Sequence, residues 1–161
     1  DTIQVKIPEG VAEGQYLTLR GEGNCGPRGG ASGDLLVVIT EKQDDFYTRE
    51  ENDLHCEVKV PVYKLVLGGS QRIPGVDGTE INIKLAPGTQ SGCTLRLREH
   101  GLPALQSRGP RGNLFVNIVA DIPKDLSSRE KELYKELAEI RKDKDTAEEE
   151  SLLDKLKNIF S

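Results

Sequence analysis

The chain repeats one stretch of its own sequence, and this repeat limits the folds that are open to it. Residues 3–23 align without a gap with residues 81–101, and after a one-residue shift residues 33–39 align with residues 112–118. The matched positions are apolar residues and glycines: Ile3, Val5, Ile7, Gly10, Gly14, Leu17, Leu19 and Gly23, with Ile81, Ile83, Leu85, Gly88, Gly92, Leu95, Leu97 and Gly101. Apolar residues recur at every second position, the period of a half-buried strand, and the glycines fall where strands turn. The sequence therefore predicts two copies of one β module.

The two copies differ in what precedes them. The second follows an alternating strand at 54–62, a short helical turn at 63–67, and a hairpin whose turn is Asp77-Gly78. Nothing comparable precedes the first copy, which has predicted strands only at 2–8, 16–20 and 35–40. We therefore expect the first module to be incomplete and to have an unpaired strand edge.

The C-terminal part of the chain has a helical pattern. Ser127 and Glu130 form a predicted capping box, and the stripe that follows at helical spacing consists of Leu133, Tyr134, Leu137 and Ile140. The stripe can cover its own module or a partner chain. A charge-dense run then reads as a solvated linker before a short amphipathic terminal helix containing Leu152, Leu153, Leu156, Ile159 and Phe160.

These patterns give a fold class and a set of boundaries. We predict an all-β chain with two tandem, similar, β-sandwich-like modules, the first incomplete, followed by C-terminal α-helices. The predicted segments are a first-domain remnant at 1–43, a connector at 44–53, a second β domain at 54–123, a dimerisation helix at 126–142, and the charged linker with the terminal helix at 143–161.

Composition and motifs exclude several function classes. A net charge of −5 argues against a nucleic-acid-binding surface, and the apolar runs are too short to cross a membrane. Cys25, Cys56 and Cys93 form no C-x-x-C pair, so we expect no metal or other cofactor, and their odd number favours a reducing compartment. The glycine motif at 21–26 precedes a strand and not a helix, so we interpret it as a hairpin loop. His55 and His100 have no partner placed by spacing for catalysis.

The alternating strand faces leave two interpretations open. They are the faces of a core, or they line a groove in which an extended peptide adds to a free strand edge. Periodicity alone does not separate the two.

Many ordered motifs in the chain resemble the carboxy-terminal region of DnaJ-type co-chaperones, from Thr2 to about Ile140. The segments that carry the resemblance are Val5–Gly14, Gly21–Gly23, Gly33–Leu35, Arg49 with Asn52–Leu54, Leu67–Gly69, Val76–Gly78 and Pro87–Gly92. The family often has His and Phe at the positions of Asp44 and Tyr47, and Gly at that of Glu51. The resemblance implies two β domains and a dimerisation helix that bind non-native polypeptides, within the heat-shock and stress response, and pass them to a DnaK-type chaperone in the cytoplasm. It also implies zinc only in a module upstream of Asp1.

The resemblance further implies where a client peptide binds. The family's groove lies on the strands that match 3–7 and 35–39, so the expected peptide-binding residues are Ile3, Val5, Leu35 and Val37. The expected dimer interface is the helical stripe Leu133, Tyr134, Leu137 and Ile140. We therefore predict a client-binding, homodimerising co-chaperone region that is not an enzyme. The alternative is a passive assembly scaffold that only displays the C-terminal helices.

Overall fold

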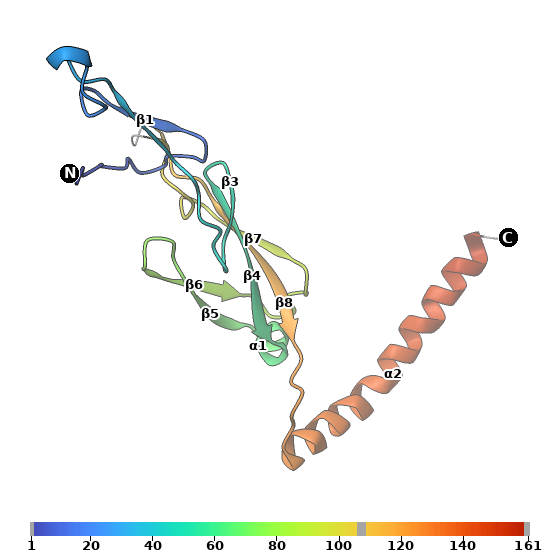
Figure 1. Cartoon of the computed structure of the whole chain (residues 1–161). Coiled ribbons are helices and arrows are strands. Elements are labelled where there is room, and N and C mark those ends of the chain that lie inside the picture. The colour runs from blue at the N-terminus through green and yellow to red at the C-terminus, as the bar shows by residue number, and fades with distance from the viewer. Residues whose placement is uncertain (1, 106–108, 160–161) are drawn as a thin grey trace. The chain divides into compact units, whose positions relative to one another are not determined.

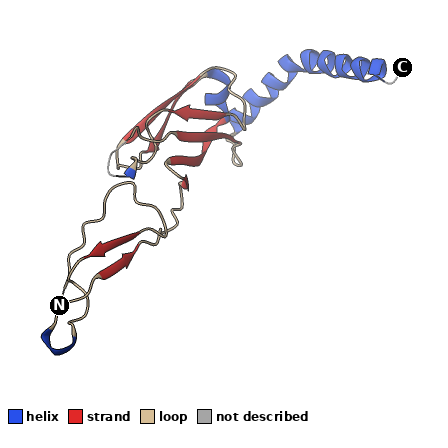
Figure 2. Cartoon of the chain, turned by 90° about the horizontal axis from the view of Figure 1, so that it is seen from above, coloured by secondary structure: helices blue, strands red, loops and turns tan. Residues whose placement is uncertain are grey.

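The computed structural model describes residues 2–105 and 109–159, which fall into two compact units, Asp1–Asp121 and Ile122–Ser161. The first unit is built from β-strands and one short helix, and the second contains one long helix (Figure 1). Figure 2, coloured by secondary structure, shows that every strand lies in the first unit. The predicted β-rich fold with helix at the C-terminal end is confirmed.

The first module contains one two-stranded antiparallel sheet. Its strands are β1 (Tyr16–Leu19) and β2 (Leu35–Val38), which pair Leu17 with Val37. The glycine-rich segment between them is a long hairpin loop, in which the amide of Gly23 donates to the carbonyl of Gly33 at 2.7 Å. It contains only a three-residue 3-10 turn at Pro27–Gly29. The hairpin-loop interpretation of the glycine motif is therefore correct.

The predicted strand at residues 2–8 is wrong. Its counterpart in the second module is β6 (Glu80–Leu85), which pairs with β5 (Gly69–Pro74) in a separate antiparallel sheet. The described part of the chain offers residues 2–8 no partner like β5. A strand exists only where a neighbour satisfies its backbone amides and carbonyls, so an alternating pattern without a neighbour stays a loop.

The second module centres on a four-stranded sheet. In spatial order its strands are β3 (Thr48–Glu50), β4 (Asp53–Pro61), β8 (Leu114–Asp121) and β7 (Thr94–Leu97). β4 and β8 pair in parallel, whereas β3 and β7 are antiparallel edge strands. Residues 44–53 therefore do more than connect the two modules, because they contain β3.

The core of the first unit lies in the second module. The inward faces of β4 and β8 pack with β5, β6 and the short helix α1 (Val62–Leu67). The buried side chains are Leu54, Cys56, Val58, Val60, Leu65, Ile73, Ile83, Leu85, Leu114, Val116 and Ile118. Cys56 is a core residue, as its place on the apolar face predicts. Burial raises the pKa of its thiol to about 11.

The sequence repeat is also a repeat of backbone geometry. In the first copy the amide of Gly14 donates to the carbonyl of Ile39 at 3.0 Å, and in the second the amide of Gly92 donates to that of Ile118 at 2.7 Å. Gly14 and Gly92 both adopt positive φ, at 77° and 87°. The two copies thus share this hydrogen bond and this glycine conformation, although residues 2–8 do not form the strand that their counterpart forms.

The second unit contains α2 (Ser128–Ile159). The predicted capping box is present: the Ser127 amide donates to a Glu130 carboxylate oxygen at 2.7 Å, and the Glu130 amide donates to the Ser127 hydroxyl at 3.3 Å. The Ser127 hydroxyl, which also donates to this carboxylate at 2.7 Å, and the Ser127 amide hold the pKa of Glu130 below its usual value. The charged run is a continuous part of this helix and not a linker, because it has no glycine or proline and is rich in Glu and Lys. Phe160, assigned to a terminal helix, lies outside the described residues.

The turn between β3 and β4 gives a stability prediction. Glu51 adopts a φ of 54°, a left-handed conformation that costs a non-glycine residue about 1–2 kcal/mol. Because glycine has no such penalty but loses more entropy on folding, we expect Glu51→Gly to raise the free energy of unfolding by about 0.5–1 kcal/mol. Urea denaturation measures this, with Glu57→Gly in the extended β4 as the control, which should lower stability. A loss of stability in Glu51→Gly would contradict the prediction.

Candidate functional site

The four residues expected to bind a client peptide lie in two segments of the first module. Leu35 and Val37 are half-buried on one face of β2, and their partners across the sheet are Leu19 and Leu17. Ile3 is 40 % exposed and Val5 is half-buried, both in the loop that precedes the first turn. The structure thus brings Leu35 and Val37 together on one strand. In the residues that it describes, no strand pairing joins Ile3 and Val5 to them.

The equivalent residues in the second module are covered by a neighbouring strand, whereas Leu35 and Val37 are only half-buried. Leu114 and Val116, the repeat equivalents of Leu35 and Val37, are fully buried at 0 % exposure. On β8 the edge away from β7 is covered by β4, whereas the corresponding edge of β2 has no strand beside it in the described part of the chain.

The loop at residues 2–8 differs from its equivalent, β6, in the same way: its apolar side chains are more exposed. Ile7 is 57 % exposed, whereas its equivalent Leu85 is 5 % exposed because β6 is held against the core. The same apolar pattern is therefore a closed core in one copy and an accessible surface with a free strand edge in the other.

The expected dimer residues are exposed on α2. Leu133, Leu137 and Ile140 are spaced by four and three residues, so they lie on one face of the helix, with Tyr134 beside them. All four side chains are exposed, and Ile140 is the most exposed of them, at 66 %. Within the described residues of the second unit, none of these side chains is buried. The stripe is apolar surface without a partner in its own unit.

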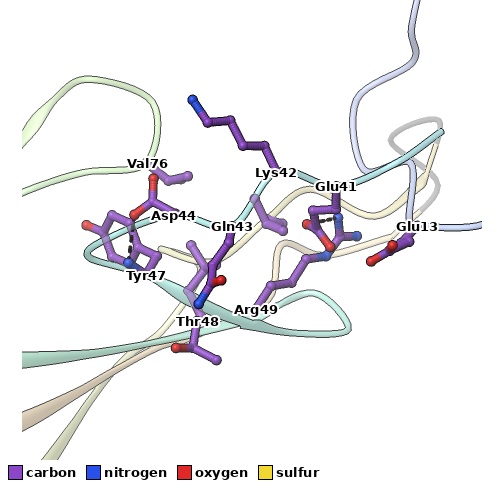
Figure 3. Close-up of a pocket in the computed structure, with 11 residues that line it drawn as sticks. Glu13, Glu41, Lys42, Gln43, Asp44, Tyr47, Thr48, Arg49 and Val76 are labelled. Carbon is purple, nitrogen blue, oxygen red and sulfur yellow. Dashed lines mark hydrogen bonds and ion pairs between the residues drawn. The ribbon is translucent and has the colours of Figure 1, made fainter.

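A pocket of about 330 Å³ lies where the connector meets both modules (Figure 3). Its lining combines acidic, basic and apolar residues: Glu13, Glu41, Lys42, Gln43, Asp44, Tyr47, Thr48, Arg49, Leu54, Val76 and Leu102. Figure 3 shows that Arg49 and Glu41 face each other in it, with a Nη1–Oε1 distance of 2.9 Å. The lining residues include no serine or cysteine, and the hydroxyl of Tyr47 donates to the carbonyl of Pro74.

The connector next to this pocket is an ordered turn. The Asp44 carboxylate accepts hydrogen bonds from the amides of Phe46 and Tyr47, both at 2.8 Å, and these bonds lower its pKa. The Tyr47 hydroxyl donates to the carbonyl of Pro74, and burial is the main cause that raises its pKa to about 12. Aspartate often begins such a turn, because its side chain can accept hydrogen bonds from amides two and three residues later. The aspartate at position 44 is therefore the signal in the sequence that could have predicted it. Sequence analysis described only a polar connector and missed it.

The remaining candidate residues have ordinary roles. His55 stacks on Phe115 with ring centroids 5.0 Å apart and lies 3.1 Å from a Glu50 carboxylate oxygen. His100 Nδ1 lies 2.7 Å from the carbonyl oxygen of Arg98. The three cysteines are free, and the described residues contain no group of three or more His, Cys, Asp or Glu side chains placed to hold a metal ion. No helix in the described ranges has the length and apolar character needed to span a bilayer.

Comparison with known proteins identifies the family. The family model described as the DnaJ C terminal domain matches residues 1–123. A protein named chaperone protein DnaJ from Chlorobium phaeobacteroides is 40 % identical over 164 residues, which cover 99 % of this chain and 41 % of the relative. The same-named protein of Leptospira biflexa is 44 % identical over 137 residues, covering 85 % of this chain and 36 % of the relative.

These matches bear on two predictions. The relatives are named as chaperones, which agrees with the prediction that the chain is not an enzyme. The chain spans about two fifths of the length of these relatives. The predicted resemblance is confirmed: the chain belongs to the DnaJ C-terminal domain family.

Proposed function

We propose that this chain is the client-holding and dimerising region of a DnaJ-type co-chaperone, which binds non-native polypeptides and works with a DnaK-type chaperone in the cytoplasm. It catalyses no reaction of its own. The observation that carries the proposal is the difference between the two copies of the β module. Leu114 and Val116 are core residues, whereas Leu35 and Val37 are half-buried on β2, one edge of which has no neighbouring strand among the residues that the structure describes.

A free edge beside apolar side chains suits an extended, unfolded polypeptide. The backbone of a client segment can pair with β2, which supplies hydrogen bonds that do not depend on sequence. The second module shows that this geometry is available, because β4 pairs in parallel with β8 along eight residue positions. Leu35 and Val37 then select apolar side chains at alternate client positions, with Ile3 and Val5 as the further residues proposed to line the groove.

Dimerisation through α2 would double this binding capacity. The exposed stripe of Leu133, Tyr134, Leu137 and Ile140 provides an apolar surface for the same stripe of a second copy. Two weak sites held in one dimer bind a long client more tightly than either site alone, because the second contact becomes intramolecular. A non-native chain with several apolar segments is such a client.

The test is a titration of a fluorescent leucine-rich peptide against Val37→Asp. A carboxylate at this half-buried position opposes an apolar client side chain, so we expect binding to weaken at least about tenfold, equivalent to about 1.4 kcal/mol. Leu36→Asp is the matched control, because Leu36 is 59 % exposed on the other face of β2 and should leave affinity unchanged. Circular dichroism confirms that both variants are folded.

Two results would contradict the proposal. Equal affinity of the folded Val37→Asp variant and its parent would place the peptide elsewhere. No peptide binding by the unchanged chain would favour the passive scaffold, in which the β modules only display the C-terminal helix.

A further inference from the structure

The side chain of Arg49 joins segments from both β modules. Arg49 belongs to β3, the edge strand of the second module's sheet, and its side chain is only 16 % exposed. Its Nη1 donates to the carbonyl of Val11 at 2.9 Å, and Nη2 lies 3.5 Å from the carbonyl of Gly10. Both acceptors belong to the first turn of the first module, 38 and 39 residues earlier in the chain.

Two further bonds fix the orientation of the guanidinium. Nε donates to the carbonyl of Glu51 at 2.7 Å, and Nη1 also pairs with Glu41 at 2.9 Å (Figure 3). One planar group thus holds the turn at 10–11, the end of the first module, and the β3–β4 turn at the same time. Lysine has a single ammonium group on a flexible stem and does not reproduce this fork of donors.

Gly10 supplies an independent contact between the same two modules. A Cβ atom at Gly10 would lie 2.4 Å from the carbonyl oxygen of Pro103 and 2.9 Å from backbone atoms of Ala104 and Leu105. The turn of the first copy is therefore docked directly on the backbone of a loop in the second module.

The equivalent glycine in the second copy of the repeat can be compared with Gly10. Gly88 is the equivalent of Gly10 and has nearly the same φ, 77° against 79°. A Cβ atom at Gly88 would meet nothing within 4 Å. The close approach is therefore not a requirement of the turn itself. It belongs to the docking of the first module on the second.

We propose that Arg49 is a positioning residue that clamps the first module's turn onto the second module and thereby fixes the spacing of the two β modules. Without the clamp, the modules remain joined mainly by residues 40–47, and relative motion is the default for small domains joined by a linker. With the clamp, the β2 edge and the four-stranded sheet stay at one separation. The inference concerns this separation and does not depend on whether the β2 edge binds clients.

The test measures the separation between spin labels on Thr18→Cys in β1 and Lys59→Cys in β4, both exposed positions, with Cys25 and Cys93 replaced by serine. With labelled chains diluted in an excess of unlabelled chain, so that distances between copies do not contribute, we expect one narrow distance distribution in the parent. Arg49→Ala and Arg49→Lys should each broaden it by about twofold or more, because the modules then move as linked domains. As an internal control, the distance distribution between one spin label on β4 and one on β7, both in the second module, should keep the same width in every variant.

The glycine pair gives the matched control. Gly10→Ala should broaden the distribution like Arg49→Ala, whereas Gly88→Ala imposes the same left-handed strain on alanine and should leave it narrow. A distribution in Arg49→Ala as narrow as in the parent would overturn the proposal. Equal broadening by Gly10→Ala and Gly88→Ala would also overturn it, since strain in the turn would then be the cause.

Discussion

The double variant Leu133→Asp, Leu137→Asp is expected to sediment as a monomer at roughly tens of micromolar, where the unchanged chain sediments as a dimer. Both leucines lie on the exposed stripe of α2, 46 % and 50 % exposed in the single chain. If this stripe is the interface, each aspartate is transferred from water into an apolar contact without a partner, which costs several kcal/mol. A symmetric dimer of the variant would contain four such aspartates, two from each copy, and their summed cost exceeds the free energy of an ordinary micromolar association, about 8 kcal/mol.

The matched control for this experiment is Lys135→Asp. Lys135 is exposed on the face of α2 opposite the stripe, so its replacement changes the charge of the helix without entering the proposed interface. We expect this variant to remain a dimer. Circular dichroism should show equal helix content in all three proteins. A monomeric unchanged chain, or a double variant that stays dimeric, would show that the stripe does not mediate dimerisation.

Leu114→Ala is expected to lower the free energy of unfolding by about 2–5 kcal/mol, and Leu35→Ala by about 1 kcal/mol or less. These leucines are equivalent in the repeat and lose the same atoms. Leu114 is 0 % exposed between β4, β7 and the core, so its truncation leaves a cavity that the packed sheet cannot close. Leu35 is only half-buried, so water reaches the space that its truncation leaves.

Urea denaturation of the two single variants and their parent measures this difference. The comparison controls for residue type and strand position, because both leucines begin equivalent strands and pair with equivalent leucines, Leu19 and Leu97. Equal losses at the two positions would mean that Leu35 is covered as fully as Leu114. The proposed function depends on Leu35 being less covered than Leu114, so equal losses would contradict it.

Much of the fold was predictable from the sequence because its signals are local. The alternation of apolar residues predicts β1, β2, β4, β6, β7 and β8, although several boundaries shift by a residue or two. Asp77-Gly78 predicts the β5–β6 hairpin, and Ser127 with Glu130 predicts the start of α2. In each case the residues that determine the structure lie within a few positions of it.

The errors arise where structure depends on distant partners or on a neighbouring helix turn. Residues 2–8 have the pattern of a strand but no neighbouring strand within residues 2–105 and 109–159. Thr48–Glu50 has little pattern but pairs with β4. The charged run after Lys142 is polar on all sides, yet it extends a helix that is already nucleated, and the Thr146 hydroxyl donates to the Lys142 carbonyl at 2.9 Å.

The candidate site was predictable only in part. Leu35 and Val37 share a face, as alternation requires, and Leu133, Leu137 and Ile140 share a helix face. Their roles in peptide binding and dimerisation stay predictions. The contacts of Arg49 have no local signature, because three of its four acceptors are backbone carbonyls, which any residue would supply at those positions.

The pairing of β4 with β8 also determines the order in which the chain can fold. β1 and β2 are joined by a local hairpin, so their sheet can form as soon as residue 38 has been synthesised. β4 pairs with a strand that begins 60 residues later, since Leu54 meets Leu114. Because the closing of such a long loop is entropically costly and slow, the apolar face of β4 stays exposed until β8 emerges from the ribosome. During synthesis the chain therefore passes through a state in which an apolar strand face is exposed and can associate with other chains.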